Sequence, residues 1–129
     1  MADVSKITAS LTDNGIVCAD ASGATVTAGG AGPKASDLLL MAVAGCSGGT
    51  MRAMLVKDGF NLSKLEVRVE GVRSEGRPRR YSEINVHYTM ECAGISEEKA
   101  AYYVKATGEN CFVLQSISSV KHLTFTLSN

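Results

Sequence analysis

The fold is decided by the sequence LLLMAVAGCSGGTMRAMLV, which occupies residues 38–56. Its length is close to the ~20 residues of a membrane-spanning helix. However, Asp37 and Lys57 bound the stretch, Arg52 interrupts it, and three glycines weaken it. A charge inside a bilayer is costly, so we expect no association with a membrane. A helix that is apolar on every side predicts a buried, central position in a globular protein.

The residues around this stretch indicate where the helix begins and ends. Ser36 or Asp37 is expected to cap its start, because their side-chain oxygens accept hydrogen bonds from the free amides of a first turn. Gly59 is expected to end it. Before the helix, residues 1–27 predict short strands joined by a hairpin turn at Asp13-Asn14-Gly15.

After the helix, hydrophobic residues alternate with polar ones, which is the pattern of strands with one buried face. Residues 65–70 form the first such strand, and a polar turn at residues 74–79 leads into a second. The second strand is expected to bury Ile84, Val86, Tyr88, Met90 and Cys92.

The rest of the chain predicts two helices and a final strand. Ser96 is expected to cap a helix over residues 97–106 that ends at Gly108, and Asn110 is expected to cap a short second helix. The strand that follows has Leu123, Phe125 and Leu127 on one face. We find no repeat or linker, so residues 1–129 are expected to form a single α+β domain.

Charge and composition exclude several classes of function. Thirteen basic residues balance thirteen acidic ones, which argues against nucleic acid as a partner. The first six residues lack the apolar core of a secretory signal. Four cysteines without such a signal favour the cytoplasm, where disulfides are mostly transient and catalytic.

Two of the four cysteines are candidates for chemistry. Cys46 lies in the middle of the central helix, and Cys111 lies at the start of a later one, where free amides and the helix dipole favour a thiolate. From the residues alone, packing in the core is the more common role of a cysteine such as Cys46. The strand patterns place Cys18 and Cys92 among core hydrophobes.

The histidines and the cysteine spacing argue against a metal site. His87 and His122 fall on the polar faces of their strands, away from the layer expected to hold the central helix. No C-x-x-C pair is present. We therefore expect neither a bound metal nor a Cys–His nucleophilic pair.

The segment Gly32-Pro33-Lys34-Ala35-Ser36-Asp37-Leu38-Leu39-Leu40-Met41-Ala42-Val43-Ala44-Gly45-Cys46 closely resembles the P-x-x-[ED]-L-L-L-x-A-L-A-G-C segment of OsmC/Ohr-like proteins. The block from Pro78 to Val86 is similar to the next block of that family, and Glu109-Asn110-Cys111-Phe112-Val113 falls where the family carries its second cysteine. The resemblance implies antiparallel sheets wrapped around a long central helix in a strand-swapped homodimer.

The resemblance also implies an activity. Family members of the peroxidase type reduce organic hydroperoxides, so Cys46 is expected to be the peroxidatic thiolate and Cys111 the resolving thiol. No bound cofactor is expected, and an external dithiol is the expected reductant. An apolar pocket beside Cys46 would suit the alkyl tail of an organic peroxide.

The charged groups that activate the first thiol differ from the family pattern. Peroxidase members use an arginine from the N-terminal strand and loop region, but residues 1–35 contain no arginine. Ser36 stands where the family has a glutamate, and Phe112 where it usually has proline. Asp37 is expected to replace the acid, and Lys34, or an arginine of the turn at residues 73–80, to replace the cation.

These differences leave a second hypothesis open. The protein would then be a non-catalytic OsmC-like dimer that binds a small apolar ligand at the subunit interface. A different thiol chemistry in the same pocket is a third alternative. The distance between the sulfurs of Cys46 and Cys111, and the charged groups near Cys46, would discriminate among these alternatives.

Overall fold

The computed structural model describes residues 3–128. They fall into two compact units, which divide between Leu39 and Leu40. Each unit is described by itself below. The expectation of a single domain over residues 1–129 stays a prediction.

The first unit contains a three-stranded antiparallel sheet, with the strands in the order β1-β2-β3. These strands are β1 (Thr8–Thr12), β2 (Gly15–Ala19) and β3 (Thr25–Ala28). Thr12 pairs with Gly15, so Asp13 and Asn14 form the two-residue turn, and the predicted hairpin is confirmed. Gly15 has a φ of +127°, a conformation that glycine adopts readily and other residues do not.

The long helix α1 (Ala35–Lys57) follows the N-terminal sheet. The backbone carbonyl of Lys34 accepts a hydrogen bond from the amide of Asp37 at 3.0 Å, so the helix begins before the residues expected to cap it. Ser36 and Asp37 lie inside the first turn, and the predicted capping role is wrong for both. Asp37 still stabilises this end, because a negative charge suits the positive end of the helix dipole. Gly59, with a φ of +84°, follows the last turn as predicted.

α1 is more exposed than a core helix usually is. By length and composition it is apolar enough to cross a membrane, and it is the one such helix among residues 3–128. A single helix of this kind is weak evidence for a membrane protein, because core helices meet the same criterion. Only 22% of its most apolar window is buried within this chain, although the helix is expected to lie in a core. The residues that it buries form one stripe: Val43, Ser47, Gly48, Met51 and Leu55.

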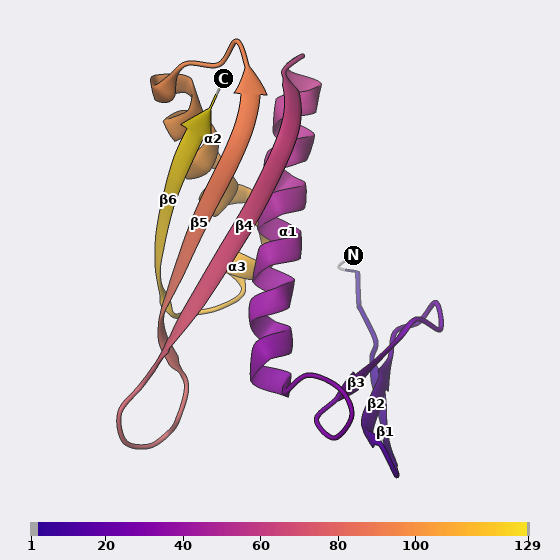
Figure 1. Ribbon diagram of the computed structural model, residues 1–129. Coiled ribbons are helices and arrows are strands. Elements are labelled where there is room, and N and C mark those ends of the chain that lie inside the picture. The colour runs from indigo at the N-terminus through magenta and orange to yellow at the C-terminus, as the bar shows by residue number, and fades with distance from the viewer. Residues whose placement is uncertain (1–2, 129) are drawn as a thin grey trace. The chain divides into compact units, whose positions relative to one another are not determined.

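The second unit contains a three-stranded sheet with the order β4-β5-β6, and Figure 1 shows α1 and α2 on one side of it. Its strands are β4 (Asn61–Arg73), β5 (Tyr81–Ala93) and β6 (Val120–Ser128). β4 and β5 form the expected antiparallel hairpin, but β6 runs parallel to β5. The expectation of purely antiparallel sheets is therefore wrong for this strand. The helices between β5 and β6 carry the chain back to the end of the sheet where β5 begins. β6 therefore runs in the same direction as β5.

Two helices form the crossover between β5 and β6. α2 (Glu97–Asn110) has Ser96 as its N-cap, which accepts a hydrogen bond from the amide of Lys99 at 3.1 Å, as predicted. The helix does not stop at Gly108. A Cβ atom there would lie 3.0 Å from Leu123 Cδ2, so this glycine serves the close packing of α2 on β6 rather than helix termination.

The junction between α2 and α3 also differs from the sequence prediction. α3 (Phe112–Gln115) has Cys111 as its N-cap, and Asn110 instead belongs to α2. The Asn110 side chain donates a hydrogen bond back to the carbonyl of Ala106 at 2.8 Å. The Asn110 side chain therefore pairs with a carbonyl group in the last turn of α2, and it does not cap α3.

The core of the second unit lies between the sheet and the helices. All five residues expected on the buried face of β5 are buried, which confirms that alternation. A Cβ atom on Gly48 of α1 would lie 3.2 Å from Val67 Cγ2 of β4, so the helix approaches the sheet closely at that residue. The remaining fully buried side chains belong to the three helices and to the cap between α2 and α3, and include Val43, Met51, Leu55, Tyr103, Cys111 and Leu114.

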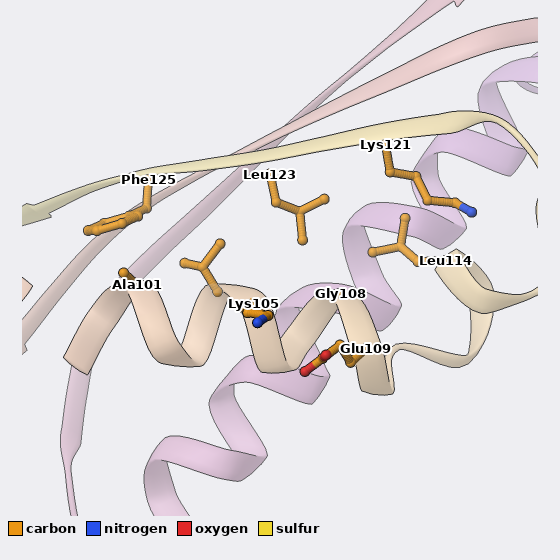
Figure 2. Close-up of a pocket in the computed structure, with 9 residues that line it drawn as sticks. Ala101, Lys105, Gly108, Glu109, Leu114, Lys121, Leu123 and Phe125 are labelled. Carbon is orange, nitrogen blue, oxygen red and sulfur yellow. The ribbon is translucent and has the colours of Figure 1, made fainter. Parts of the chain in front are cut away.

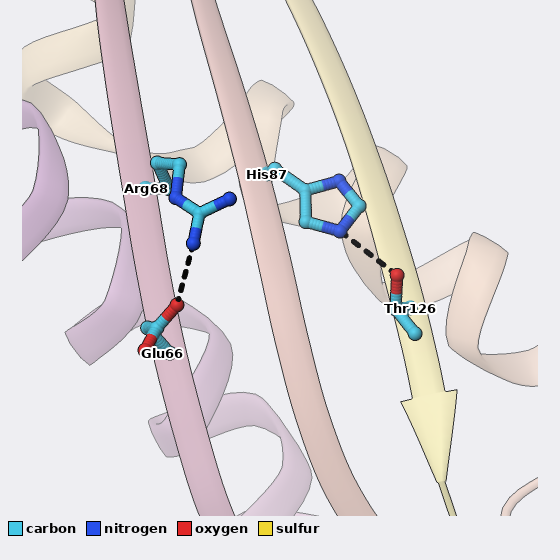
Figure 3. Close-up of polar contacts among 4 residues, drawn as sticks. All are labelled: Glu66, Arg68, His87 and Thr126. Carbon is cyan, nitrogen blue, oxygen red and sulfur yellow. Dashed lines mark hydrogen bonds and ion pairs between the residues drawn. The ribbon is translucent and has the colours of Figure 1, made fainter.

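The opposite face of the sheet is polar, as Figure 3 shows for one part of it. His87 lies 2.7 Å from Thr124 Oγ1 and 2.9 Å from Thr126 Oγ1, and His122 lies 3.0 Å from a Glu83 oxygen. Both histidines therefore point away from the core, as their positions in the alternation predict. Their hydrogen-bond partners are these polar side chains and not Cys46 or Cys111.

Candidate active site

Cys46 and Cys111 come together in the second unit. Cys46 lies on α1 and is partly buried against the core, whereas Cys111 is fully buried between α2 and α3. Both are free thiols, and the two side chains form a hydrogen bond in which the Cys111 S–H donates to the Cys46 sulfur. The structure thus brings together two sulfurs that are 65 positions apart in the sequence (111 minus 46).

The start of α3 supplies two further hydrogen bonds to Cys46. The first amides of a helix have no partner inside it, and the Cys111 side chain makes no capping hydrogen bond to them. The backbone N–H groups of Val113 and Phe112 donate to the Cys46 sulfur instead. These donors favour the thiolate over the thiol.

The balance of these effects lowers the pKa of the Cys46 thiol. The Val113 amide is the largest cause, burial opposes it, and the hydrogen bonds from Cys111 and Phe112 add to it. The Thr50 side chain also lies near the sulfur, but its hydroxyl proton is directed to the backbone carbonyl of Cys46 at 2.8 Å. We therefore assign the shift mainly to the backbone amides of α3.

The pKa of Cys111 moves in the opposite direction. Burial raises the pKa of this thiol, and the hydrogen bond and charge of Cys46 raise it further. Of the two sulfurs, Cys46 is therefore the one that ionises first, and the Cys111 thiol serves as its hydrogen-bond donor. Nucleophilic chemistry at a cysteine needs this thiolate form.

The other residues considered in the sequence have different positions. Lys34, Ser36 and Asp37 belong to the first unit, and their supporting role beside Cys46 stays a prediction. Cys92 is buried and burial raises the pKa of its thiol, which fits the predicted core position. Cys18 is half-buried in β2.

Sequence reasoning missed the donors that act on Cys46. It expected a charged side chain as the activating group, but within residues 40–128 the causes of the lowered pKa are hydrogen bonds. Every residue except proline has a backbone N–H group, so the identities of Phe112 and Val113 do not reveal these donors. The available signal was the expected helix start at Cys111, which implies unpaired amides in the residues that follow.

A separate groove lies between α2, α3 and β6, with a volume of about 450 Å³. Figure 2 shows Leu123 and Phe125 of β6 facing α2 across it, with Leu114 and Lys121 toward one end. Its lining is mainly apolar. This groove is the feature that favours the ligand-binding alternative, although it lies within one chain.

The lowered pKa of Cys46 predicts a pH dependence. Because the folded structure stabilises the thiolate, alkylation of Cys46 by iodoacetamide should rise with pH and level off at a lower pH than in the unfolded chain. Rates measured at each pH by mass mapping of the Cys46 peptide will check this. The same protein in urea is the control, and a Cys46 midpoint at or above the urea value would contradict the hydrogen-bond assignment.

The fold is similar to those of several solved structures. A hypothetical protein from Aquifex aeolicus VF5 has a TM-score of 0.84 at 22% identity, with 98% of each chain covered. An OsmC-like protein from Mycoplasma pneumoniae has a TM-score of 0.82 at 22% identity over 100% of both chains. The organic hydroperoxide resistance protein OhrB of Bacillus subtilis has a TM-score of 0.62 at 16% identity, with 98% of each covered.

At these identities the solved structures establish the fold alone. Among curated proteins, none matches this sequence. The sequence model of the family described as OsmC-like protein matches residues 28–126, which include both Cys46 and Cys111. The match covers more than half of the chain and agrees with the fold, so the chain belongs to the OsmC-like protein family.

Proposed function

We propose that this protein is a thiol-dependent peroxidase that reduces organic hydroperoxides through Cys46 and Cys111. The observation that carries the proposal is the hydrogen bond between the two cysteine side chains, which lowers the pKa of Cys46 and raises that of Cys111. Membership of the OsmC-like family supports a redox role in general. Relatives of the same fold named for hydroperoxide resistance support the substrate class.

The first chemical step takes place at Cys46. Its thiolate attacks the terminal oxygen of the hydroperoxide, an S–O bond forms, and the O–O bond breaks. Cys46 becomes a sulfenic acid, and the alkoxide that leaves takes a proton from solvent to become an alcohol. Cys46 is the more accessible of the two sulfurs, which fits this role.

The second step uses Cys111. Its sulfur attacks the sulfenic sulfur, an S–S bond forms, and the hydroxide that leaves takes up the Cys111 proton as water. An external dithiol then reduces the disulfide and restores both thiols. No bound cofactor is needed for this cycle, and a reducing cytoplasm is the compartment we propose for it.

This proposal predicts the outcome of a mild oxidation. One equivalent of tert-butyl hydroperoxide should lower the number of free thiols from four to two and create a disulfide between Cys46 and Cys111. Thiol counting and mass mapping of the oxidised protein without reduction will measure this. The Cys111→Ser variant is the matched control, in which dimedone should trap the Cys46 sulfenic acid. Four unchanged thiols would count against the peroxidase and leave the ligand-binding alternative.

We further propose that the active form is a strand-swapped homodimer. Apolar side chains on both units are exposed within one chain, including Met41 at 54%, Val56 at 55% and Leu11 at 83%. Monomeric proteins seldom leave contiguous apolar surface in water, so a second copy of the chain would cover it. The exposed face of α1 would then lie in a shared core.

The dimer predicts a mass of twice 13.5 kDa in sedimentation equilibrium. Met41→Glu should shift the equilibrium toward the monomer, because a carboxylate would be buried without a partner. His87→Glu, on the polar face of the sheet, is the control and should keep the mass of the parent. A species of 13.5 kDa at micromolar concentration would contradict the dimer.

A further inference from the structure

The groove between α2, α3 and β6 has no role in the chemistry above, although it is large enough to hold a small molecule. Its volume of about 450 Å³ lies within the range of about 300–1,000 Å³ that is usual for ligand sites. Its lining belongs to the second unit, and Cys46 and Cys111 are not among the described residues that line it. The groove is therefore separate from the cysteine pair.

The two ends of the groove differ in polarity. At one end the Phe125 ring of β6 lies above Ala101 of α2, and Leu123 continues the apolar surface toward α3 (Figure 2). At the other end Lys121 lies beside Leu114 (Figure 2). Phe125 follows Lys121 by four residues on β6, so the groove runs for roughly 13 Å along the strand.

Lys121 is an unusual residue for this face of β6. It shares one side of the strand with Leu123, Phe125 and Leu127, and it is half-buried as they are, whereas most lysines are exposed to water. Its ammonium group donates a hydrogen bond to the backbone carbonyl of Ile117. This bond fixes the position of the ammonium, uses one of its three N–H donors and leaves the others for a ligand.

The charged side chains of the lining favour a ligand with a single negative charge. Lys105 and Lys121 line the groove together with one acid, Glu109, so two positive charges against one negative charge give a formal charge of +1. A carboxylate carries one negative charge and forms strong, charge-assisted hydrogen bonds with an ammonium group. A phosphate monoester carries closer to two negative charges and fits this lining less well.

We propose that the groove binds a straight-chain alkyl carboxylate, with its chain along Phe125 and Leu123 and its carboxylate at Lys121. The ligand is bound and released unchanged, so no covalent bond forms or breaks. This inference goes beyond the proposed peroxidase function and does not depend on it. It also differs from the hypothesis of a ligand at the subunit interface, because the groove lies within one chain.

The main test compares two ligands that have the same alkyl chain. Octanoate should bind the protein near neutral pH, and octanol should bind at least about tenfold more weakly, because only the carboxylate forms a charge-assisted hydrogen bond. NMR titrations that follow ¹³C-labelled leucine methyl groups will give both dissociation constants. The methyl groups of Leu114 and Leu123 should shift, and those of Leu11 in β1 should not. Equal affinity for the two ligands, or no saturable shift at Leu114 and Leu123, would overturn the proposal.

Lys121→Met removes the charge and keeps most of the length of the side chain. This variant should bind octanoate at least about tenfold more weakly and octanol as the parent does, whereas Lys121→Arg should keep most of the affinity for octanoate. Lys64→Met is the matched control, because Lys64 is an exposed lysine on β4, at the opposite edge of the sheet. It should bind octanoate like the parent. An unchanged affinity for octanoate in Lys121→Met would refute the role of Lys121.

A further pair of measurements separates the groove from the cysteine pair. Alkylation of Cys46 with iodoacetamide should leave the affinity for octanoate unchanged. Ala101→Phe introduces a ring at the apolar end of the groove from an exposed position on α2, and it should weaken binding at least about tenfold. If alkylation prevents binding and Ala101→Phe does not, the alkyl chain occupies the cysteine site and the groove proposal fails. Neither result depends on whether a peroxide oxidises the two thiols.

Discussion

Cys46→Ser should abolish peroxide turnover while leaving the fold intact. A serine hydroxyl does not ionise near neutral pH, so the hydrogen bonds from the amides of Val113 and Phe112 have no thiolate to stabilise. We expect the consumption of tert-butyl hydroperoxide, with dithiothreitol as reductant, to fall at least about 1000-fold, as when other enzymes lose their nucleophile.

Cys18→Ser is the matched control for this variant. Cys18 is a half-buried thiol in the first unit, and nothing in the proposed cycle uses it. The peroxide turnover of Cys18→Ser should stay within about twofold of the parent, in line with the small effects of most substitutions away from a site. Equal loss in both variants, or full activity in Cys46→Ser, would sink the assignment of the peroxidatic sulfur.

Ile84→Ala should strongly destabilise the second unit. Ile84 lies on β5, the central strand, and its side chain is fully buried. Truncation removes buried apolar surface and leaves a cavity, so the free energy of unfolding should fall by about 2–5 kcal/mol. Urea denaturation followed by circular dichroism, at one fixed protein concentration, will measure it.

Val120→Ala is the corresponding control on β6. Val120 is 57% exposed at the start of that strand, so its truncation should change the free energy of unfolding by less than about 1 kcal/mol. If the two variants lose equal stability, the burial described for β5 does not hold in solution.

The sequence predicts the parts of the fold that depend on one buried face. The alternation in β5 identifies its buried residues correctly, because a shift of one residue would turn all of them toward water. Ser96 was also predictable as a cap, since its side chain has the free amide of Lys99 in reach. The direction of β6 was not, because a period of two is the same in parallel and antiparallel strands.

The candidate site was less accessible to sequence reasoning. Spacing alone left Cys46 as a core residue, and only the family resemblance paired it with Cys111. The amides that act on Cys46 depend on where α3 begins. The sequence predicted Asn110 as its cap, whereas Cys111 is the cap and the helix begins at Phe112.

The amides at the start of α3 have a consequence for how this protein tolerates substitution. Phe112 is 79% exposed, and nearly any side chain at that position would leave its N–H in place. The lowered pKa of Cys46 therefore depends on the course of the main chain, which many side-chain substitutions leave unchanged. Substituting the side chains around Cys46 one by one should therefore change its pKa at few positions. Val113→Pro, in contrast, would remove the N–H group that lowers this pKa most.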